Sequence, residues 1–331
     1  MTFRLYISPQ GSRILSNAKS ITVHGRIRET WSTENKIADA FQGLGWDVSR
    51  VDFRSSRLKS LLASASQRDI FLTSPAGMGD HRAVKFLRAL RSSGVVTVGH
   101  HNDLYVGLQR ETLIGSSPFF QETDLVFTAD GDPVAQDVFE QHGVSHCWLP
   151  PAAPLDECYI ASTGHTKGRD VLFVGSYPYP HHKVWPYRHD LVKWLSNQYM
   201  SRFAVVGGRD AVREHNLNAL LVSSKVVVGD SLCPGFRKPY YWSNRVYEVV
   251  GRGGFLVMPN IPGLSEHFSD GVQLAFYDFG NFDQLRQIVS HYMTHKDDRM
   301  RVVAAGVQHV RDHHTWHHRI QDIIGKLEEV Q

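Results

Sequence analysis

The stretch that decides the fold is "WSNRVYEVVGRGGFLVMPNIPGLSEHF", residues 242–268. Arg245 and Glu248 stand three residues apart where a helical pattern begins, so both side chains share one helical face. The pattern ends in glycines, and a short apolar run with two prolines behind it follows. The sequence therefore predicts a helix over 243–251 and a buried strand over 254–259.

The same alternation extends outward over most of the chain. Short apolar runs, each closed by a polar or glycine-containing turn, are separated by segments with helical spacing. Continuous apolar runs indicate strands that are buried on both faces, hence parallel sheets with helices on each side. The runs are "SITVHG" (20–25), "DIFLTSP" (69–75), "GVVTVGHH" (94–101), "DLVFTAD" (124–130), "DVLFVGS" (170–176), "RFAVVGG" (202–208) and "SKVVVGDS" (224–231).

Three prolines in "LPPAAPLDE" (149–157) interrupt this alternation and predict a linker between two doubly wound domains. Beyond the second domain, Asp297 to Glu329 reads as one long helical region. The predicted parts are an N-terminal extension (1–20), a first Rossmann-like domain (21–150), a second one (151–300) and a C-terminal helix that packs back across the domains (301–331).

Composition narrows the class of protein. A net charge of +3 over 331 residues is too weak to argue for nucleic-acid binding by itself. Three cysteines without a CxxC pair suit a reducing compartment. The first 20 residues lack the apolar region of a signal peptide, and no apolar run reaches the length of a membrane span. We therefore expect a cytoplasmic protein.

The predicted helix at 243–251 carries the chemistry of a nucleotide site. Its first N–H groups are unpaired and its dipole favours anions there, so Ser243, Asn244 and Arg245 suit a diphosphate. Glu248, one turn further, can accept both hydroxyls of a ribose. The alternative is an ordinary salt bridge between Arg245 and Glu248 on a solvated helix, which the spacing alone favours.

Resemblance to a known family extends this interpretation. The segments "SNRVYEVVGRGGFLVMPNIPGLSEHFSDGVQLAFY" and "QLRQIVSHYMTHKDDRMRVVAAGVQHVRDHHTWHHR" resemble the C-terminal part of the glycosyltransferase group 1 superfamily. The nearest pattern is that of a branch with spore-protein-like members: R-x-x-E, a glycine pair, a strand, a Glu after a turn and a terminal H-T-aromatic-x-x-R. The matching residues are Arg245, Glu248, Gly253, Gly254, Glu266, His314, Thr315, Trp316 and Arg319.

The resemblance implies a GT-B fold, with two Rossmann-like domains facing a central cleft. It also implies a glycosyltransferase that needs no metal and retains the anomeric configuration, with a nucleoside-diphosphate sugar, here most simply a UDP-sugar, as donor. By resemblance Glu248 holds the donor ribose and Arg245 the diphosphate. One departure is Tyr240, which stands where many retaining relatives carry a second acidic residue.

The departing diphosphate calls for positive charge at its leaving oxygen. Arg245 is the first candidate, and the turn Gly175–Ser176 lies at the end of a strand in the same domain. Candidates for a second cation are Lys183, Arg188, Arg209, Arg237 and Lys238. In the first domain, His100, His101 and Asp103 follow a strand and are candidates to orient the sugar or deprotonate the acceptor, with Gly25 and Arg26 beside them.

Several alternatives stay open. The acceptor is unspecified: a glycan, a protein, a small molecule or, as a minority option that "VSRVDFRSSRLK" (48–59) permits, a modified base in DNA. The chain could also be an inactive GT-B-like protein that binds nucleotides or glycans. No cofactor or metal is expected, because the histidine-rich segment 309–319 lacks a closed ligand set and favours packing. The absence of G-x-G-x-x-G after the first strand argues against an oxidoreductase.

Overall fold

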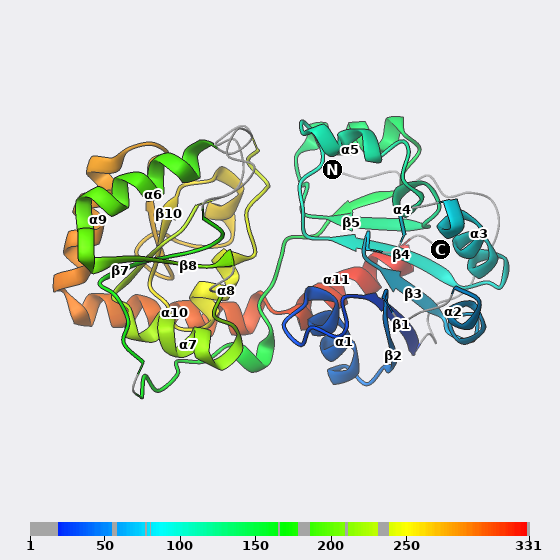
Figure 1. Ribbon diagram of the computed structural model, residues 1–331, viewed down its shortest axis with the longest axis horizontal. Coiled ribbons are helices and arrows are strands. Elements are labelled where there is room, and N and C mark those ends of the chain that lie inside the picture. The colour runs from blue at the N-terminus through cyan, green and yellow to red at the C-terminus, as the bar shows by residue number, and fades with distance from the viewer. Residues whose placement is uncertain are drawn as a thin grey trace. The chain divides into compact units, whose positions relative to one another are not determined.

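We describe the protein from a computed structural model. It describes residues 19–54, 58–76, 78–79, 81–164, 166–177, 186–208, 211–230 and 238–329. The chain forms two compact units, one that runs to Pro150 and resumes at Trp316, and a second from Pro151 to Thr315. Both are coloured along the chain in Figure 1.

The first unit is a parallel six-stranded sheet in the order β2-β1-β3-β4-β5-β6. Its inner strands are continuous apolar runs whose residues are buried, as expected for strands covered on both faces. The strands are β1 (Ser20–Gly25), β2 (Asp47–Asp52), β3 (Ile70–Thr73), β4 (Val96–His101), β5 (Leu125–Thr128) and β6 (His146–Trp148).

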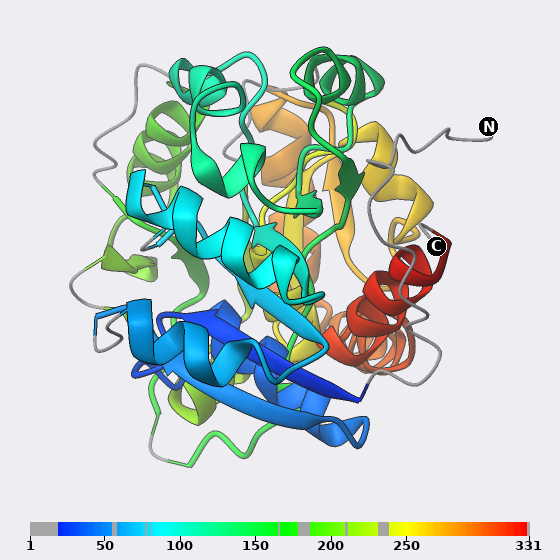
Figure 2. The ribbon, with the colours of Figure 1, turned by 90° about the vertical axis from the view of Figure 1, so that its right-hand side faces the viewer.

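Helices cover both faces of this sheet. Figure 2 looks onto this unit with α2 and α3 in front of the strands. The apolar faces of α3, α4 and α5 pack with β3 and β5 into one core that includes Phe71, Phe119 and Phe139. The helices are α1 (Thr33–Gly43), α2 (Leu58–Ala65), α3 (His81–Ser92), α4 (Pro118–Gln121), α5 (Pro133–Gln141) and α11 (Trp316–Glu329), of which α11 packs against α1.

The second unit is a parallel five-stranded sheet in the order β11-β10-β9-β7-β8. Helices α6 and α9 lie on one face, while α7 and α8 lie on the other with α10 packed against α8 (Figure 1). The elements are β7 (Val171–Val174), α6 (Pro186–Tyr199), β8 (Phe203–Val206), α7 (Glu214–Ser223), β9 (Val226–Val228), α8 (Arg245–Gly251), β10 (Leu256–Pro259), β11 (Ala275–Tyr277), α9 (Phe282–Thr294) and α10 (Lys296–His313). The predicted parallel sheets with helices on both faces are thus confirmed.

The C-terminal helical region differs from its prediction as one continuous element. It divides into α10 and α11 because His314 leaves the helical conformation, with φ −134° and ψ 37°. The carbonyl of His314 accepts a hydrogen bond from the Ala153 N–H at 3.0 Å, and Thr315 pairs with Ala153. This pairing joins residues far apart in sequence, so helical periodicity could not reveal it.

The glycines after α8 end the helix and allow β10 to begin. Gly253 has φ +83°, a left-handed conformation that L-residues avoid, and its N–H donates to the Val250 carbonyl at 3.2 Å. A Cβ on Gly254 would come within 2.8 Å of Val249 Cγ1. The glycine pair in the resemblance therefore has a structural reason.

Gly253→Ala is expected to destabilise the protein by about 1–2 kcal/mol, because alanine must adopt the left-handed conformation. Gly325→Ala is the matched control: it lies inside α11 with nothing within 4 Å of an added Cβ. That change is expected to be neutral or to stabilise by up to about 1 kcal/mol. Urea unfolding of both variants would measure the difference, and equal effects would contradict the argument.

Candidate functional site

The sheet of the second unit reverses its direction of growth beside β7. From β7 the chain moves to β8 on one side and then returns to β9 on the other, so the carboxyl ends of β7 and β9 form a topological switch point. Ligands of open α/β sheets bind in the crevice at such a point. Gly175 and Ser176 follow β7 there, and Gly229 and Asp230 follow β9.

A buried ion pair joins the two strand ends. Arg188 of α6 donates from Nε to Asp230 Oδ2 at 2.7 Å and from Nη2 to Asp230 Oδ1 at 2.8 Å. Its Nη1 donates to the Ser176 carbonyl at 3.3 Å. The two side chains are only 6% and 4% exposed. Arg188 therefore holds the switch point together, and its charge is already directed at a carboxylate.

The helix that decided the fold begins at Arg245, two residues later than predicted. Asn244 occupies the N-cap position, and the Arg245 N–H donates to Ser243 Oγ at 3.0 Å. Arg245 Nη1 donates to Glu248 Oε2 at 2.7 Å, and Asn244 Nδ2 donates to Glu248 Oε1 at 3.0 Å. The structure therefore brings all four predicted residues of this segment together.

This arrangement leaves binding capacity on both charged groups. Each carboxylate oxygen has two acceptor positions, so Glu248 can still accept from two vicinal hydroxyls while Arg245 and Asn244 hold its orientation. The side chains of Arg245 and Glu248 are 24% and 20% exposed, so both remain accessible. The i,i+3 salt bridge and a ribose-binding role are thus compatible.

Tyr240, the departure from the family pattern, lies beside a carboxylate from another segment. Its hydroxyl donates to Glu266 Oε1 at 2.9 Å. The hydrogen bond to Glu266 raises the pKa of Tyr240 above its usual value. The N–H of Gly263 donates to the Pro239 carbonyl at 2.9 Å, which fixes the turn of Glu266 next to Tyr240. Tyr240 itself is not acidic, but the carboxylate of Glu266 is hydrogen-bonded to it.

In the first unit the two predicted histidines have different surroundings. His100 is 2% exposed, packs edge-on against Trp316 at 5.6 Å, and burial lowers its pKa to about 3. His101, at the end of β4, lies with Nδ1 2.7 Å from Tyr105 Oη. Burial lowers the pKa of His101 as well, and the nearby Asp103 carboxylate partly opposes this. His101 is therefore the better placed of the two for acid–base work, as a neutral imidazole.

Asp103 is engaged with an arginine. Its carboxylate accepts from Arg110 Nη1 at 2.5 Å and from Nη2 at 2.7 Å, and also accepts from the Leu104 N–H at 2.9 Å. The pair orders the loop after β4. Asp103 acts on His101 through its charge, as the direction of its contribution to the His101 pKa shows.

Sequence reasoning missed Glu34. It lies in the first turn of α1, is 9% exposed, and sits so near Gly25 that a Cβ there would come within 2.4 Å of Glu34 Cγ. Its charge raises the pKa of His101, whereas that of Arg26 lowers it. The residue reads in sequence as an ordinary first-turn acid, so only the tertiary structure relates it to His101.

Three predicted cations have no described position: Lys183, Arg209 and Arg237 lie outside the described residues.

The histidine-rich segment packs against a neighbouring loop. His309 Nε2 lies 2.7 Å from the His267 carbonyl and 3.2 Å from His314 Nε2. Within the described part of the chain, no three His, Cys, Asp or Glu side chains converge as metal ligands. Of the helices described, none is long and apolar enough to cross a membrane.

Known proteins share this architecture. Residues 165–325 match the family described as glycosyl transferase-like. No curated protein matches the chain. HepE of Anabaena, solved with UDP and glucose, is 13% identical with a TM-score of 0.60, over 94% of this chain and 99% of that one.

Two further solved structures agree. A glycosyltransferase of Rickettsia africae is 11% identical with a TM-score of 0.60, over 95% of this chain and 99% of its own. An α-glucosyltransferase, solved with UDP-glucose and DNA containing an abasic site, is 9% identical with a TM-score of 0.65, over 93% and 99%. The family match and the shared two-sheet fold agree with the resemblance of residues 245–319. The chain therefore shares the GT-B fold of these structures, and its residues 165–325 are similar to the glycosyl transferase-like family.

Proposed function

We propose that the protein transfers a sugar from a nucleoside-diphosphate sugar, most directly a UDP-sugar, to an acceptor hydroxyl. The observation that carries the proposal is the Asn244–Arg245–Glu248 constellation, which follows β9 of the switch point. Glu248 binds the ribose hydroxyls and Arg245 the diphosphate. Relatives solved with UDP or UDP-glucose support this choice of donor.

The transfer is proposed to proceed without a metal and with retention. Negative charge develops on the leaving diphosphate oxygen, and the fixed guanidinium of Arg245 stabilises it. Glu266, held by the Tyr240 hydroxyl, takes the place of the missing acidic residue near the transferred sugar. Candidates for a second cation remain Lys183, Arg209, Arg237 and Lys238. We assign Arg188 with Gly175 and Ser176 to the frame of the site, because its guanidinium binds Asp230.

The first unit is proposed to bind the acceptor. His101, neutral because burial lowers its pKa, accepts the proton of the acceptor hydroxyl, and Glu34 stabilises the resulting imidazolium. Asp103 keeps the loop after β4 in place through Arg110.

A glycan or a small molecule suits the acceptor role better than DNA. A DNA acceptor is suggested by the arginines of 48–59. The α-glucosyltransferase solved with DNA, which has a similar fold, also supports it. However, Arg50 pairs with Asp39 at 2.8 Å and Arg54 with Asp52 at 3.1 Å, so the charges of these two arginines are balanced within the protein.

The donor proposal predicts that UDP raises the melting temperature of the protein and that Glu248→Ala weakens UDP binding about tenfold to a hundredfold, because hydrogen bonds to a charged group are lost. A thermal-shift screen with UDP, GDP, TDP, ADP and CMP, followed by calorimetric titration, measures this. Asp283→Ala is the matched control, since it removes another i,i+3 pair with Arg286 at 2.9 Å.

The outcomes separate the alternatives. Stabilisation by no nucleotide would contradict the transferase proposal, whereas UDP binding without hydrolysis or transfer of UDP-sugars would favour an inactive binding protein. Retention is tested by ¹H NMR of the sugar released from an α-linked donor. The first product is expected to be the α-anomer, and initial release of the β-anomer would overturn retention.

A further inference from the structure

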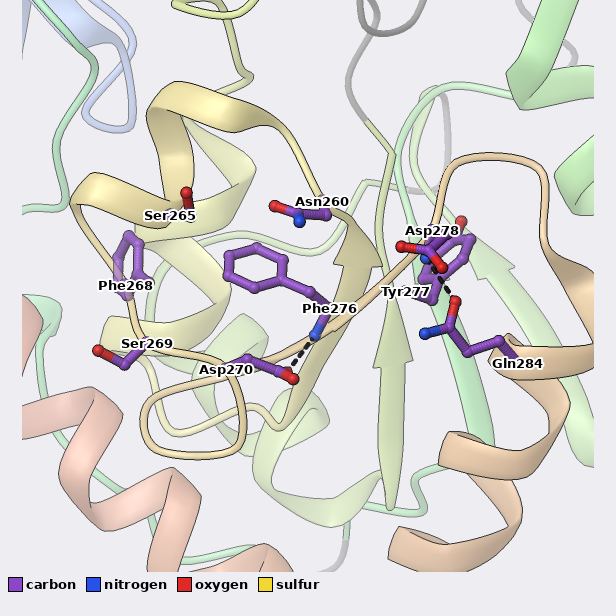
Figure 3. Close-up of a pocket in the computed structure, with 9 residues that line it drawn as sticks. All are labelled: Asn260, Ser265, Phe268, Ser269, Asp270, Phe276, Tyr277, Asp278 and Gln284. Carbon is purple, nitrogen blue, oxygen red and sulfur yellow. Dashed lines mark hydrogen bonds between the residues drawn. The ribbon is translucent and has the colours of Figure 1, made fainter.

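A pocket lies in the unit that carries the proposed donor site. This pocket of about 240 Å³ opens at the carboxyl ends of the edge strand β11 and its neighbour β10. Figure 3 shows Phe276 at its centre, with Asn260 on one side and Asp270 on the other. Its nine lining residues are Asn260, Ser265, Phe268, Ser269, Asp270, Phe276, Tyr277, Asp278 and Gln284.

The pocket has an aromatic base and a polar rim. Phe268 and Phe276 are 2% and 7% exposed, so their rings are fixed by packing, whereas the Tyr277 ring belongs to the core on the other side of the sheet, with its hydroxyl 2.8 Å from that of Tyr187. The rim residues are solvent-exposed: Asn260, Ser265, Ser269, Asp270 and Asp278. A ligand here meets the small exposed part of the Phe276 ring and the polar groups around it.

Hydrogen bonds hold the rim in place while leaving polar atoms available. Asp270 Oδ1 accepts from the Phe276 N–H at 2.7 Å, and Gln284 Oε1 accepts from the Asp278 N–H at 2.6 Å (Figure 3). Because Gln284 uses its oxygen there, its Nε2 group remains a donor. Within the described part of the chain, neither Gln284 Nε2 nor Asp270 Oδ2 has a hydrogen-bond partner.

The pocket is distinct from the proposed donor site. The donor residues belong to the switch point of β7 and β9 and to α8, whereas the pocket belongs to β10, β11 and α9. The segment 262–268 contributes to the pocket and to the surroundings of the donor site. Ser265 and Phe268 line the pocket. On the donor side, Glu266 accepts a hydrogen bond from Tyr240, and His267 packs against Trp242.

The chemistry of the lining selects one class of ligand. The nine residues include two carboxylates and no Lys or Arg, so a phosphate or diphosphate is disfavoured. Carboxylates and amides can pair with neighbouring hydroxyls as acceptors and donors, and fixed aromatic rings offer an apolar surface to the C–H face of a sugar ring.

We propose that this pocket binds one neutral sugar residue of a glycan. Asp278, Asn260 and Gln284 bond its hydroxyls and Phe276 contacts its apolar face. The identification of that glycan as the acceptor rests on the proposed glycosyl transfer, but sugar binding does not. A glycan docked on the unit that holds the donor would be retained between transfers.

The Phe276 N–H offers a direct reporter, since it bonds the rim residue Asp270. Protein labelled with ¹⁵N-phenylalanine is titrated with glucose, galactose, mannose, N-acetylglucosamine and their β-linked disaccharides, with the Phe276 signal assigned from Phe276→Leu. We expect at least one sugar to shift that signal in a saturable way. Asp278→Ala and Asn260→Ala are each expected to weaken binding at least tenfold, while Asp283→Ala, outside the pocket, leaves it unchanged.

Further arms make each outcome decisive. A disaccharide that binds more tightly than its monosaccharide supports a glycan, and equal binding points to a free monosaccharide and overturns the glycan assignment. Shifts with spermidine but with no sugar, or with neither, overturn the proposal. Sugar binding that is lost in Glu248→Ala but kept in Asp278→Ala would place the sugar in the donor site instead. UDP binding in Asp278→Ala tests the donor proposal separately.

Discussion

Arg188→Met is expected to lower the free energy of unfolding of the second unit by about 3–5 kcal/mol, because it leaves the buried carboxylate of Asp230 without its counter-charge. Both side chains are almost fully buried, and the pair is bidentate with distances of 2.7 and 2.8 Å. Methionine keeps most of the arginine's volume, so the loss reports charge and hydrogen bonds and not a cavity. Urea unfolding followed by hydrogen exchange in β7 and β9 measures it.

A double variant distinguishes the effect of an unpaired buried charge from a general disruption of the fold. In Arg188→Met/Asp230→Asn the uncompensated charge is gone, so we expect a recovery of about half of the loss or more. Arg286→Met breaks the exposed pair with Asp283 and is expected to cost no more than about 0.5 kcal/mol. A loss below about 1 kcal/mol in Arg188→Met would show that the pair does not hold the switch point.

The same pair shows what the sequence could predict about the site and what it could not. The sequence indicates Arg188 as one of several candidate cations and "SKVVVGDS" (224–231) as a strand closed by a turn. Their pairing joins residues 42 apart in sequence, and no local pattern encodes it. A free arginine and a buried arginine on a carboxylate have the same sequence signature.

Local patterns did predict the strands and the segment around α8. The runs "IFLT", "LVFT" and "VLFV" are buried strands as expected, because continuous apolar residues have no solvated face to offer. Arg245 and Glu248 meet because three residues are close to one helical turn. This spacing is a property of the helix itself, so the contact can be predicted without knowledge of the tertiary fold.

Local sequence patterns could not predict contacts between segments that are distant in the chain. Glu266 reaches Tyr240, and Glu34 lies by Gly25 and acts on His101, only through the way strands and loops come together. The break between α10 and α11 likewise depends on Ala153, which belongs to a different part of the chain. The sequence pattern includes Glu266, but its contact with Tyr240 and the position of Glu34 beside Gly25 were found only in the structure.

The first unit is expected to lose stability steeply as pH falls from about 6.5 towards 4, the largest effect of solution conditions that we anticipate. Three of its buried histidines are held neutral: burial lowers the pKa of His24 to about 4 and those of His100 and His146 to about 3. His146 is fixed between Thr128 Oγ1 at 2.8 Å and Gln136 Oε1 at 3.0 Å, and it stacks on Phe139.

The direction of the effect follows from the sign of these shifts. The unfolded chain takes up a proton at each histidine near pH 6.5, whereas the folded unit does not until about pH 4 or below. The stabilisation is therefore complete above pH 6.5 and is lost as pH falls. Each histidine contributes about 1.4 kcal/mol per pH unit in this window, so three contribute about 4 kcal/mol per unit. The hydrogen bond from Arg54 lowers the pKa of Asp52, so protonation of this carboxylate affects stability only at lower pH.

Hydrogen exchange of the β4 and β5 amides between pH 7 and 5, corrected for intrinsic exchange rates, measures the opening free energy of this unit. His146→Gln is expected to reduce the pH slope by about one proton, because glutamine does not titrate there. His81→Gln, at an exposed position in the same unit, is the control for the substitution itself. An opening free energy that stays constant over this range would show that these histidines are protonated in the folded state. Burial would then not hold them neutral, and the neutral form of His101 that the proposed acid–base role requires would lose its physical basis.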